Sequence, residues 1–229
     1  MDKLFDTVLL MLDGSEITLE IFAVTLVLAL PLGMLAALGR LSQLKLLSRL
    51  VEFYVWIMRG TPLMLQLLFV YFALPMVGIR LPDLAAALLA FTLNYAAYFA
   101  EIFRAGIQSI PRGQFEAADS QGFNYLQKMM IIILPQSIKI ILPPSVNQIV
   151  NLIKNTAVLY IIGGSDLISL TYNFVTGATT GGAYAPAYLV CGVLFFILCF
   201  PLTTLATTWE NKLKQQDART PGAPGKAVS

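Results

Sequence analysis

Five long apolar stretches with almost no charge constrain the fold of this chain more than any other feature of its sequence. A helix needs about 20 residues to cross the roughly 30 Å of hydrocarbon in a bilayer, where unpaired backbone groups are too costly for less regular structure. Hydrophobic residues make up 57% of the sequence and charged residues only 12%. We therefore predict an all-α integral membrane protein. The expected spans are residues 18–39, 54–79, 84–106, 129–155 and 187–209.

Prolines and glycines interrupt these stretches and indicate where they bend or end. Pro31 and Gly33 predict a kink in the first span, and Pro143-Pro144 predict a bend in the fourth because they remove backbone donors. Residues 167–209 carry no charge and are too many for one crossing, so we place a break at the Gly/Thr-rich segment 176–186. The membrane domain is thus expected over 1–210, followed by a disordered cytoplasmic tail over 211–229.

Lysine and arginine predict the orientation, because short cytoplasmic loops of membrane proteins are enriched in them. An outside N-terminus places 11 of the 15 basic residues inside and three outside, with Lys139 in the fourth span. The inside residues are Arg40, Lys45, Arg49, Arg59, Arg104, Arg112, Lys128, Lys212, Lys214, Arg219 and Lys226. The predicted topology is N-out and C-in, with segment 108–128 in the cytoplasm.

Several functional classes are disfavoured by composition. The sequence has no histidine, which removes imidazole-based catalysis and the common metal sites. Cys191 and Cys199 are eight residues apart, about 12 Å along a helix and too far for a disulfide. The net charge of +2 is dispersed, so no nucleic-acid partner is expected. The first residues lack the basic region of a cleaved signal peptide, so we expect the first span to be retained.

The segment between the third and fourth spans has the pattern of two short helices joined at a glycine. Pro111-Arg112-Gly113 predicts a turn, and "QFEAADSQ" favours a short helix. Gly122 can end that helix in left-handed geometry, and Asn124 can cap the next helix. By spacing alone, an ordinary interfacial loop helix is the simpler interpretation of this segment.

The same segment resembles the EAA motif of permease subunits of type I ABC importers. The matched positions are Glu116, Ala117, Ala118, Gly122, Ile132, Leu134 and Pro135. The surroundings resemble the polar amino acid uptake branch of that family, through "RGTPLMLQLLFVYFALP", "YFAEIFRAGIQSIPRGQ", "LPPSVNQIVNLIKNT" and "YIIGGSDL". The similarity covers roughly residues 15–210. One departure is Asn155, where the family often has an acidic residue.

This resemblance implies a multi-pass permease of a bacterial cytoplasmic membrane, with no catalytic residue of its own. Glu116, Ala117, Ala118, Gly122, Leu134 and Pro135 would couple it to two ATPase subunits, which would bind ATP and magnesium. The chain itself holds no G-x-x-x-x-G-K-[ST] phosphate loop. Its other implied partners are a second copy or a similar permease, an extracytoplasmic binding protein and an amino acid. The family does not settle whether a defined substrate site lies in the membrane.

Polar residues at membrane depth are candidates for a substrate pathway, because burial in lipid without a partner costs several kcal/mol. Asn94 lies about 15 Å below the outer end of the third span, and Tyr98 and Glu101 share its face. The fourth span carries Asn147, Gln148, Asn151 and Asn155. The alternatives are hydrogen bonds between helices for the asparagines and an ion pair with Arg104 for Glu101.

The sequence therefore predicts an amino acid importer permease working by alternating access, and two other functions stay open. The same architecture suits another small solute, such as an opine, a polyamine-like amine or cystine. A structural or sensory membrane subunit is the more distant alternative, and the EAA match disfavours it.

Overall fold

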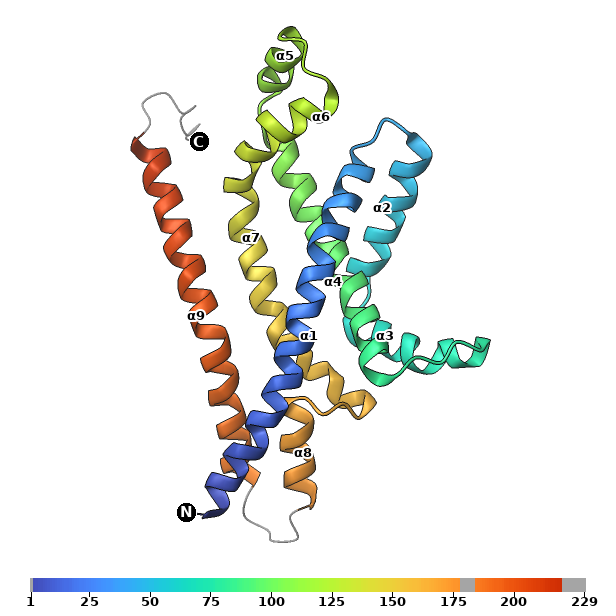
Figure 1. Ribbon diagram of the computed structural model, residues 1–229, viewed down its shortest axis with the longest axis vertical. Helices are drawn as coiled ribbons and strands as arrows, with labels where there is room; N and C mark the ends of the chain where they lie inside the picture. The colour runs from blue at the N-terminus through green and yellow to red at the C-terminus, as the bar shows by residue number, and fades with distance from the viewer. Residues whose placement is uncertain (1, 178–183, 220–229) are drawn as a thin grey trace, which may run out of the picture.

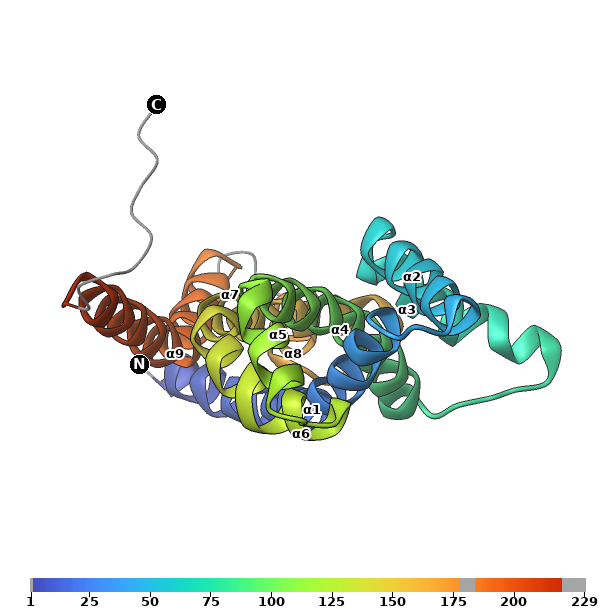
Figure 2. The ribbon, with the colours of Figure 1, turned by 90° about the horizontal axis from the view of Figure 1, so that it is seen from above.

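The computed structural model describes residues 2–177 and 184–219, and these form a bundle of helices (Figures 1 and 2). Four long helices run along the long axis of the molecule (Figure 1). They are α1 (Asp2–Arg40), α4 (Asp83–Gln108), α7 (Leu134–Asn155) and α9 (Tyr184–Arg219). Four helices in the described residues are long and apolar enough to span a membrane, or five if a bent pair counts as one. The predicted all-α membrane fold is confirmed.

The predicted span 54–79 is a bent pair of helical segments. Helix α2 (Lys45–Gly60) is followed by α3 (Leu63–Leu68), the π-helix η1 (Phe69–Ala73) and the 3-10 helix η2 (Leu74–Val77). The two parts meet at 106°. Thr61 and Pro62 separate them in extended geometry, because the proline ring disfavours helical geometry in the residue before it. The second part therefore turns away from the bundle, as Figure 1 shows.

Small residues let α4 pass close to its neighbours. A Cβ atom on Gly33 of α1 would lie 2.7 Å from the Cβ of Phe99, and one on Gly106 would overlap Ile141 of α7. Helix α4 also carries buried alanines, including Ala90 and Ala96. Such residues are the usual means by which membrane helices pack, since lipid tails compete with apolar side chains. Helix α4 is thus the centre of the bundle.

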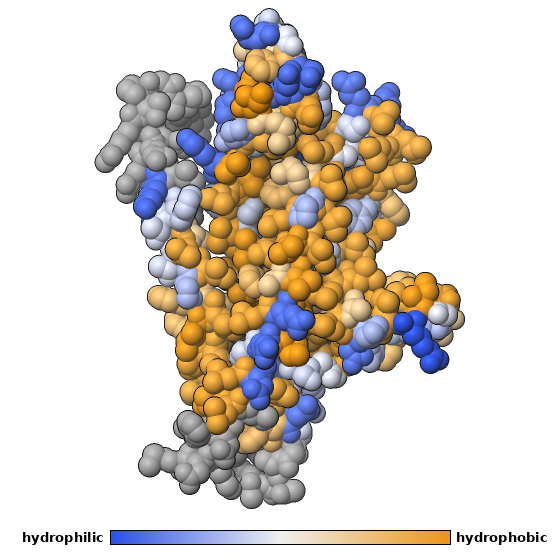
Figure 3. Space-filling model, in the orientation of Figure 1, coloured by the Kyte–Doolittle hydropathy of each residue, from blue (hydrophilic) through white to orange (hydrophobic). Residues whose placement is uncertain are grey.

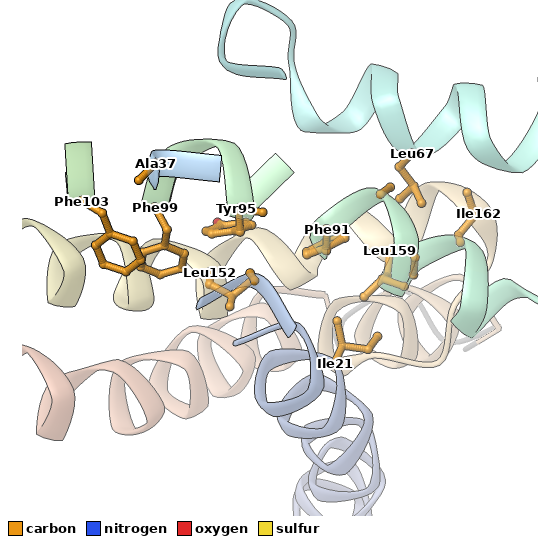
Figure 4. Packing of buried hydrophobic residues seen from close by; sticks show 14 of the residues in the cluster. Ile21, Ala37, Leu67, Phe91, Tyr95, Phe99, Phe103, Leu152, Leu159 and Ile162 are labelled. Carbon is orange, nitrogen blue, oxygen red and sulfur yellow. The ribbon is translucent and has the colours of Figure 1, made fainter. Parts of the chain in front are cut away.

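The main apolar cluster joins α1, α4, α7 and the 3-10 helix η4 (Thr156–Ile162). Figure 4 shows Phe91, Tyr95, Phe99 and Phe103 following one another along α4, with Leu152 and Leu159 close by. Pro143 and Pro144 lie inside α7 without ending it. The π-helix η3 (Lys128–Ile133) leads into α7 from the short α6 (Tyr125–Gln127).

The last part of the chain lies at the margin of the bundle. Helix α8 (Leu167–Gly177) packs near the start of α1, and the break predicted at 176–186 falls mostly on residues 178–183, outside the described ones. Only 6% of the apolar window of α9 is buried, against 67% for α4. Helix α9 continues through residues 211–219, where a tail without regular structure was predicted. The rest of that tail, residues 220–229, lies outside the described residues.

Candidate functional site

The EAA segment forms a helix, a glycine corner and a second capped helix at one end of the molecule. Helix α5 (Arg112–Ser120) and α6 lie at the end opposite the N-terminus, where hydrophilic side chains gather (Figures 1 and 3). Glu116 and Ala117 are exposed on α5, and Ala118 is buried. An exposed carboxylate and a small side chain on an outward helix leave room for a partner surface.

Local geometry fixes the corner between α5 and α6. Gly122 has a φ of +76°, and a Cβ atom there would meet no atom within 4 Å, so its conformation rather than space calls for glycine. Asn124 accepts a hydrogen bond from the backbone of Gln127 at 2.9 Å, and the Gln127 side chain accepts one from Asn124 N at 3.0 Å. This capping box confirms the cap predicted at Asn124.

Side-chain contacts connect α5 to η3 and α7, which follow it in sequence. Gln136 of α7 donates to Gln114 of α5 at 3.1 Å, and Lys128 forms an ion pair with Asp119. Beneath α5, an apolar cluster contains residues of α4 and η3, with Leu134 packed against it. Its buried members are Ile107, Ile110, Met129 and Ile133, and Phe115 of α5 contacts it. Pro135 is exposed at the first turn of α7. Because α5 contacts this cluster and α7, a movement of α5 would be transmitted to both α4 and α7.

A second candidate site is a cavity of about 460 Å³ at the bend between α2 and α3. We call it the amide cavity, because four amide side chains line it. Its lining is Thr61, Pro62, Leu63, Met64, Asn94, Tyr98, Gln148, Asn151, Asn155 and Val158. The structure thus brings together the candidate residues of α4 and α7, apart from Glu101 and Asn147. Asn147 is exposed elsewhere on α7.

Asn94 connects the amide cavity to the bend. It is 3% exposed, and its Nδ2 donates to the Met58 carbonyl and to Gln66 Oε1, each at 3.0 Å. Gln66 in turn donates to the carbonyls of Met58 and Thr61 and to the Thr61 hydroxyl. The carbonyls left without helical partners by the break are satisfied in this way. Sequence analysis missed Gln66, although a lone amide within apolar α3 was a signal for it.

Asn155 is fixed from the other side of the cavity. Its Nδ2 donates to the hydroxyl of Tyr95 at 2.7 Å, and Tyr95 is fully buried within the main apolar cluster. No hydrogen bond within the described residues uses Asn155 Oδ1, so its carbonyl oxygen is available to the cavity. Tyr95 was not among the predicted residues, because nothing in its local sequence distinguishes it from a core aromatic.

Glu101 lies outside the amide cavity and pairs with three arginines. Arg104 contacts both of its carboxylate oxygens, Arg40 of α1 pairs with Oε2, and Arg59 of α2 lies 3.6 Å from it. The predicted alternative of an ion pair with Arg104 is present and is part of a larger cluster. Arg40 also reaches Glu52 at 3.3 Å. Three positive charges therefore surround the one carboxylate of this part of α4.

Arg59 joins this charged cluster to the amide cavity. Its guanidinium carbon lies 5.6 Å from the centre of the Tyr98 ring, within the range of a cation–π contact. Tyr98 lines the amide cavity, whereas Arg59 and Glu101 line a neighbouring cavity of about 440 Å³ together with Arg40, Arg49 and Glu52. The Arg59–Tyr98 contact is thus the boundary between the two cavities. Residues 2–177 and 184–219 hold no cluster of three side chains suited to a metal ion.

Comparison with known proteins gives consistent matches over most of the chain. Residues 29–215 match a family described as the binding-protein-dependent transport system inner membrane component. The chain is 38% identical over 207 residues to the arginine transport system permease protein ArtQ of Bacillus subtilis, covering 90% of this chain and 93% of the relative. It is 37% identical over 212 residues to a protein of the same bacterium named as a probable glutamine ABC transporter permease protein, GlnM, covering 93% and 97%.

A solved structure shares the arrangement of the helices. A chain of an amino acid ABC transporter crystallised with histidines superposes with a TM-score of 0.80 and 32% sequence identity. The superposition covers 89% of this chain and 94% of that one.

Proposed function

This chain belongs to the family of binding-protein-dependent transport system inner membrane components, and from that premise we propose that it carries an amino acid into the cytoplasm. It is a permease subunit of the ABC type and an integral protein of a bacterial inner membrane. The observation that carries the proposal is the match along nearly the whole chain to permeases named for arginine and glutamine.

We propose that the energy for transport comes from partner chains. Two ATP-binding cassette subunits would bind ATP and magnesium, because this chain holds no phosphate loop. An extracytoplasmic binding protein would deliver the amino acid, and a second copy or a similar permease would complete the pathway. The largely unburied apolar surface of α9 supports a partner within the membrane, since contiguous apolar surface of this kind needs lipid or protein to cover it.

Coupling to the ATPase would pass through α5. Glu116 and Ala117 are exposed at the end of the molecule, and the Gly122 corner fixes the angle between α5 and α6. Ala118 faces inward, and Leu134 packs against the cluster that joins α4 and α7, directly before Pro135. Closure of the ATPase subunits would move α5 and, through this cluster, tilt α4 and α7, which both contribute to the lining of the amide cavity. Alternating access follows from such a rigid-body movement.

We propose that the amide cavity is part of the substrate pathway. Asn94, Tyr98, Gln148, Asn151 and Asn155 line it, and Thr61 is a further lining residue that the sequence prediction did not include. Polar side chains at this depth are costly unless they face protein or water, and a cavity shared by three helices provides that environment. Glu101 would serve the fold instead, by holding the arginines of α1, α2 and α4 together.

The test is uptake by the complete transporter. Proteoliposomes containing this chain, its ATPase subunits and its binding protein should accumulate at least one amino acid when ATP is supplied. An opine, a polyamine and cystine should be offered in parallel, because accumulation of one of them alone would replace the proposed substrate class. Absence of any ATP-dependent accumulation would refute the importer function and favour a structural or sensory subunit.

A further inference from the structure

We infer that the amide cavity selects amino acids whose side chains are uncharged and form hydrogen bonds, and that it rejects cationic ones. This inference rests on the proposed function, because it takes the amide cavity as part of the substrate pathway. It names the substrate class within that function, which the relatives leave open between a cationic and an amide side chain.

The lining of the cavity is polar but carries no charge. Its hydrogen-bonding groups are the Thr61 hydroxyl, the Tyr98 phenol and the amides of Asn94, Gln148, Asn151 and Asn155. An amide side chain offers both donors and acceptors, and so does the primary amide of a solute such as glutamine. A guanidinium or ammonium side chain would instead be desolvated here without a carboxylate, and burial of an unpaired charge is costly.

The nearest carboxylate on α4 is already paired. Glu101 contacts Arg104, Arg40 and Arg59, and Glu52 contributes only a longer contact to Arg40. These three arginines outnumber the two carboxylates, so the inner side of the cavity carries an excess positive charge. A second cation entering the cavity would be repelled from that side.

Arg59 can anchor the carboxylate that every amino acid carries. Its guanidinium lies over Tyr98 at the inner boundary of the cavity, and 40% of its side chain is exposed. The α-carboxylate would approach Arg59, and the α-ammonium group would meet carbonyl oxygens such as Asn155 Oδ1. A zwitterion is neutralised in this arrangement. An additional carboxylate or cation on the side chain would lie among the amides of α7 without a counter-charge.

Direct binding to the transporter tests this selection. The permease purified with its ATPase subunits, without the binding protein, is placed in nanodiscs of phosphatidylethanolamine and phosphatidylglycerol. Binding of radiolabelled glutamine is measured, with unlabelled arginine and glutamate as competitors. We expect glutamine to bind at least about tenfold more tightly than either competitor. Equal or tighter binding of arginine would overturn the inference, and so would the absence of binding by all three.

Matched amide-to-acid variants provide the second arm. Asn151→Asp and Asn155→Asp place a carboxylate in the cavity and should raise arginine affinity relative to glutamine by about tenfold. Asn147→Asp makes the same change on the same helix outside the cavity and should leave the ratio unchanged. Equal ratios in all three variants would contradict the assigned cavity.

ATP-dependent uptake by the complete transporter separates the two proposals. Uptake of arginine together with arginine-selective binding would refute the proposed selection against cationic side chains, but it would still support the importer function. If the complete transporter accumulates no amino acid, both proposals fail.

Discussion

The α5 segment and the amide cavity are built in different ways. Contacts within α5 and its corner join residues three to five positions apart, as in the hydrogen bonds from Gly122 to Asp119 and from Phe123 to Ala118. The cavity depends on contacts between distant positions, since Gln66 and Asn94 are 28 positions apart and Tyr95 and Asn155 are 60 positions apart. A locally built segment can move as a unit, whereas a cavity built across helices changes shape when those helices tilt. The α5 segment is therefore suited to receive the movement of the ATPase subunits. The amide cavity is suited to convert that movement into a change in its access to the two sides of the membrane.

The largest effect should come from a charge reversal on α5 that leaves the rest of the fold intact. Glu116→Lys should lower ATP-driven uptake by at least about tenfold, because an added like charge or lost pair at an interface costs several kcal/mol. Melting temperature and membrane content should stay the same, since Glu116 is exposed. Gln121→Lys, which also places a lysine on this exposed segment, at the residue that follows α5, is the control. Unchanged uptake in Glu116→Lys would contradict the docking role.

A change at Asn94 should affect stability as well as transport. Asn94→Leu leaves Gln66 Oε1 without its donor and should lower the free energy of unfolding by about 1–3 kcal/mol. We also expect slower uptake, because the bend beside the cavity loses a contact. Thermal unfolding in detergent and uptake in vesicles measure the two effects.

Thr92→Val is the control for Asn94→Leu. The Thr92 hydroxyl is buried on the same helix and has no hydrogen-bond partner among the residues that the structure describes, so its loss should be neutral or stabilising. If Asn94→Leu behaves like Thr92→Val, Asn94 does not hold the bend.

The Gly122 corner should show an intermediate effect confined to coupling. Gly122→Ala forces a Cβ into left-handed geometry at about 1–2 kcal/mol and should shift the angle of α5. ATPase activity should then respond less to the loaded binding protein, while glutamine binding to the cavity stays the same. Gly113→Ala lies within α5 in open space and should leave the response of ATPase activity unchanged. A reduced response in both variants would mean that α5 tolerates no added methyl group, whatever the backbone geometry.

The smallest effect is expected in the charged cluster between the two regions. Arg40→Gln removes one of three guanidiniums around Glu101, and Arg104 still contacts both carboxylate oxygens. Partly exposed ion pairs contribute about 0–1 kcal/mol, so unfolding should change by no more than that. Measurement at low and high salt checks this estimate, because the difference should shrink as salt rises. A larger loss would make Arg40 a structural anchor of the bundle.

Sequence alone predicted the local features well. The left-handed glycine at 122 and the cap at Asn124 follow from rules that act within one turn of helix, and the structure confirms both. The pairing of Glu101 with Arg104 was recognised as an alternative because the two residues are three positions apart on one helix. The resemblance to the importer family located the α5 segment as a whole.

Contacts between residues that are far apart in the chain could not be predicted from the sequence. Arg40 lies 61 positions from Glu101, and no periodicity within either helix indicates that they meet. The four-residue spacing of Asn147, Asn151 and Asn155 suggested one polar stripe, yet Asn151 and Asn155 line the cavity and Asn147 does not, because the cavity forms where the bend at Pro62 brings α3 beside the later turns of α7. Pro62 lies inside the predicted span 54–79, where no break was predicted, and the angle of the break depends on how α2 and α3 pack against α4.

The marginal position of α9 has a consequence for biosynthesis. Helix α9 contacts mainly α7 and α8, and the central packing of α4 against α1 and α7 is made without it. During translation the bundle core can therefore assemble before α9 leaves the ribosome. We expect α9 to join last, with its unburied apolar side still available for the next subunit that the membrane delivers.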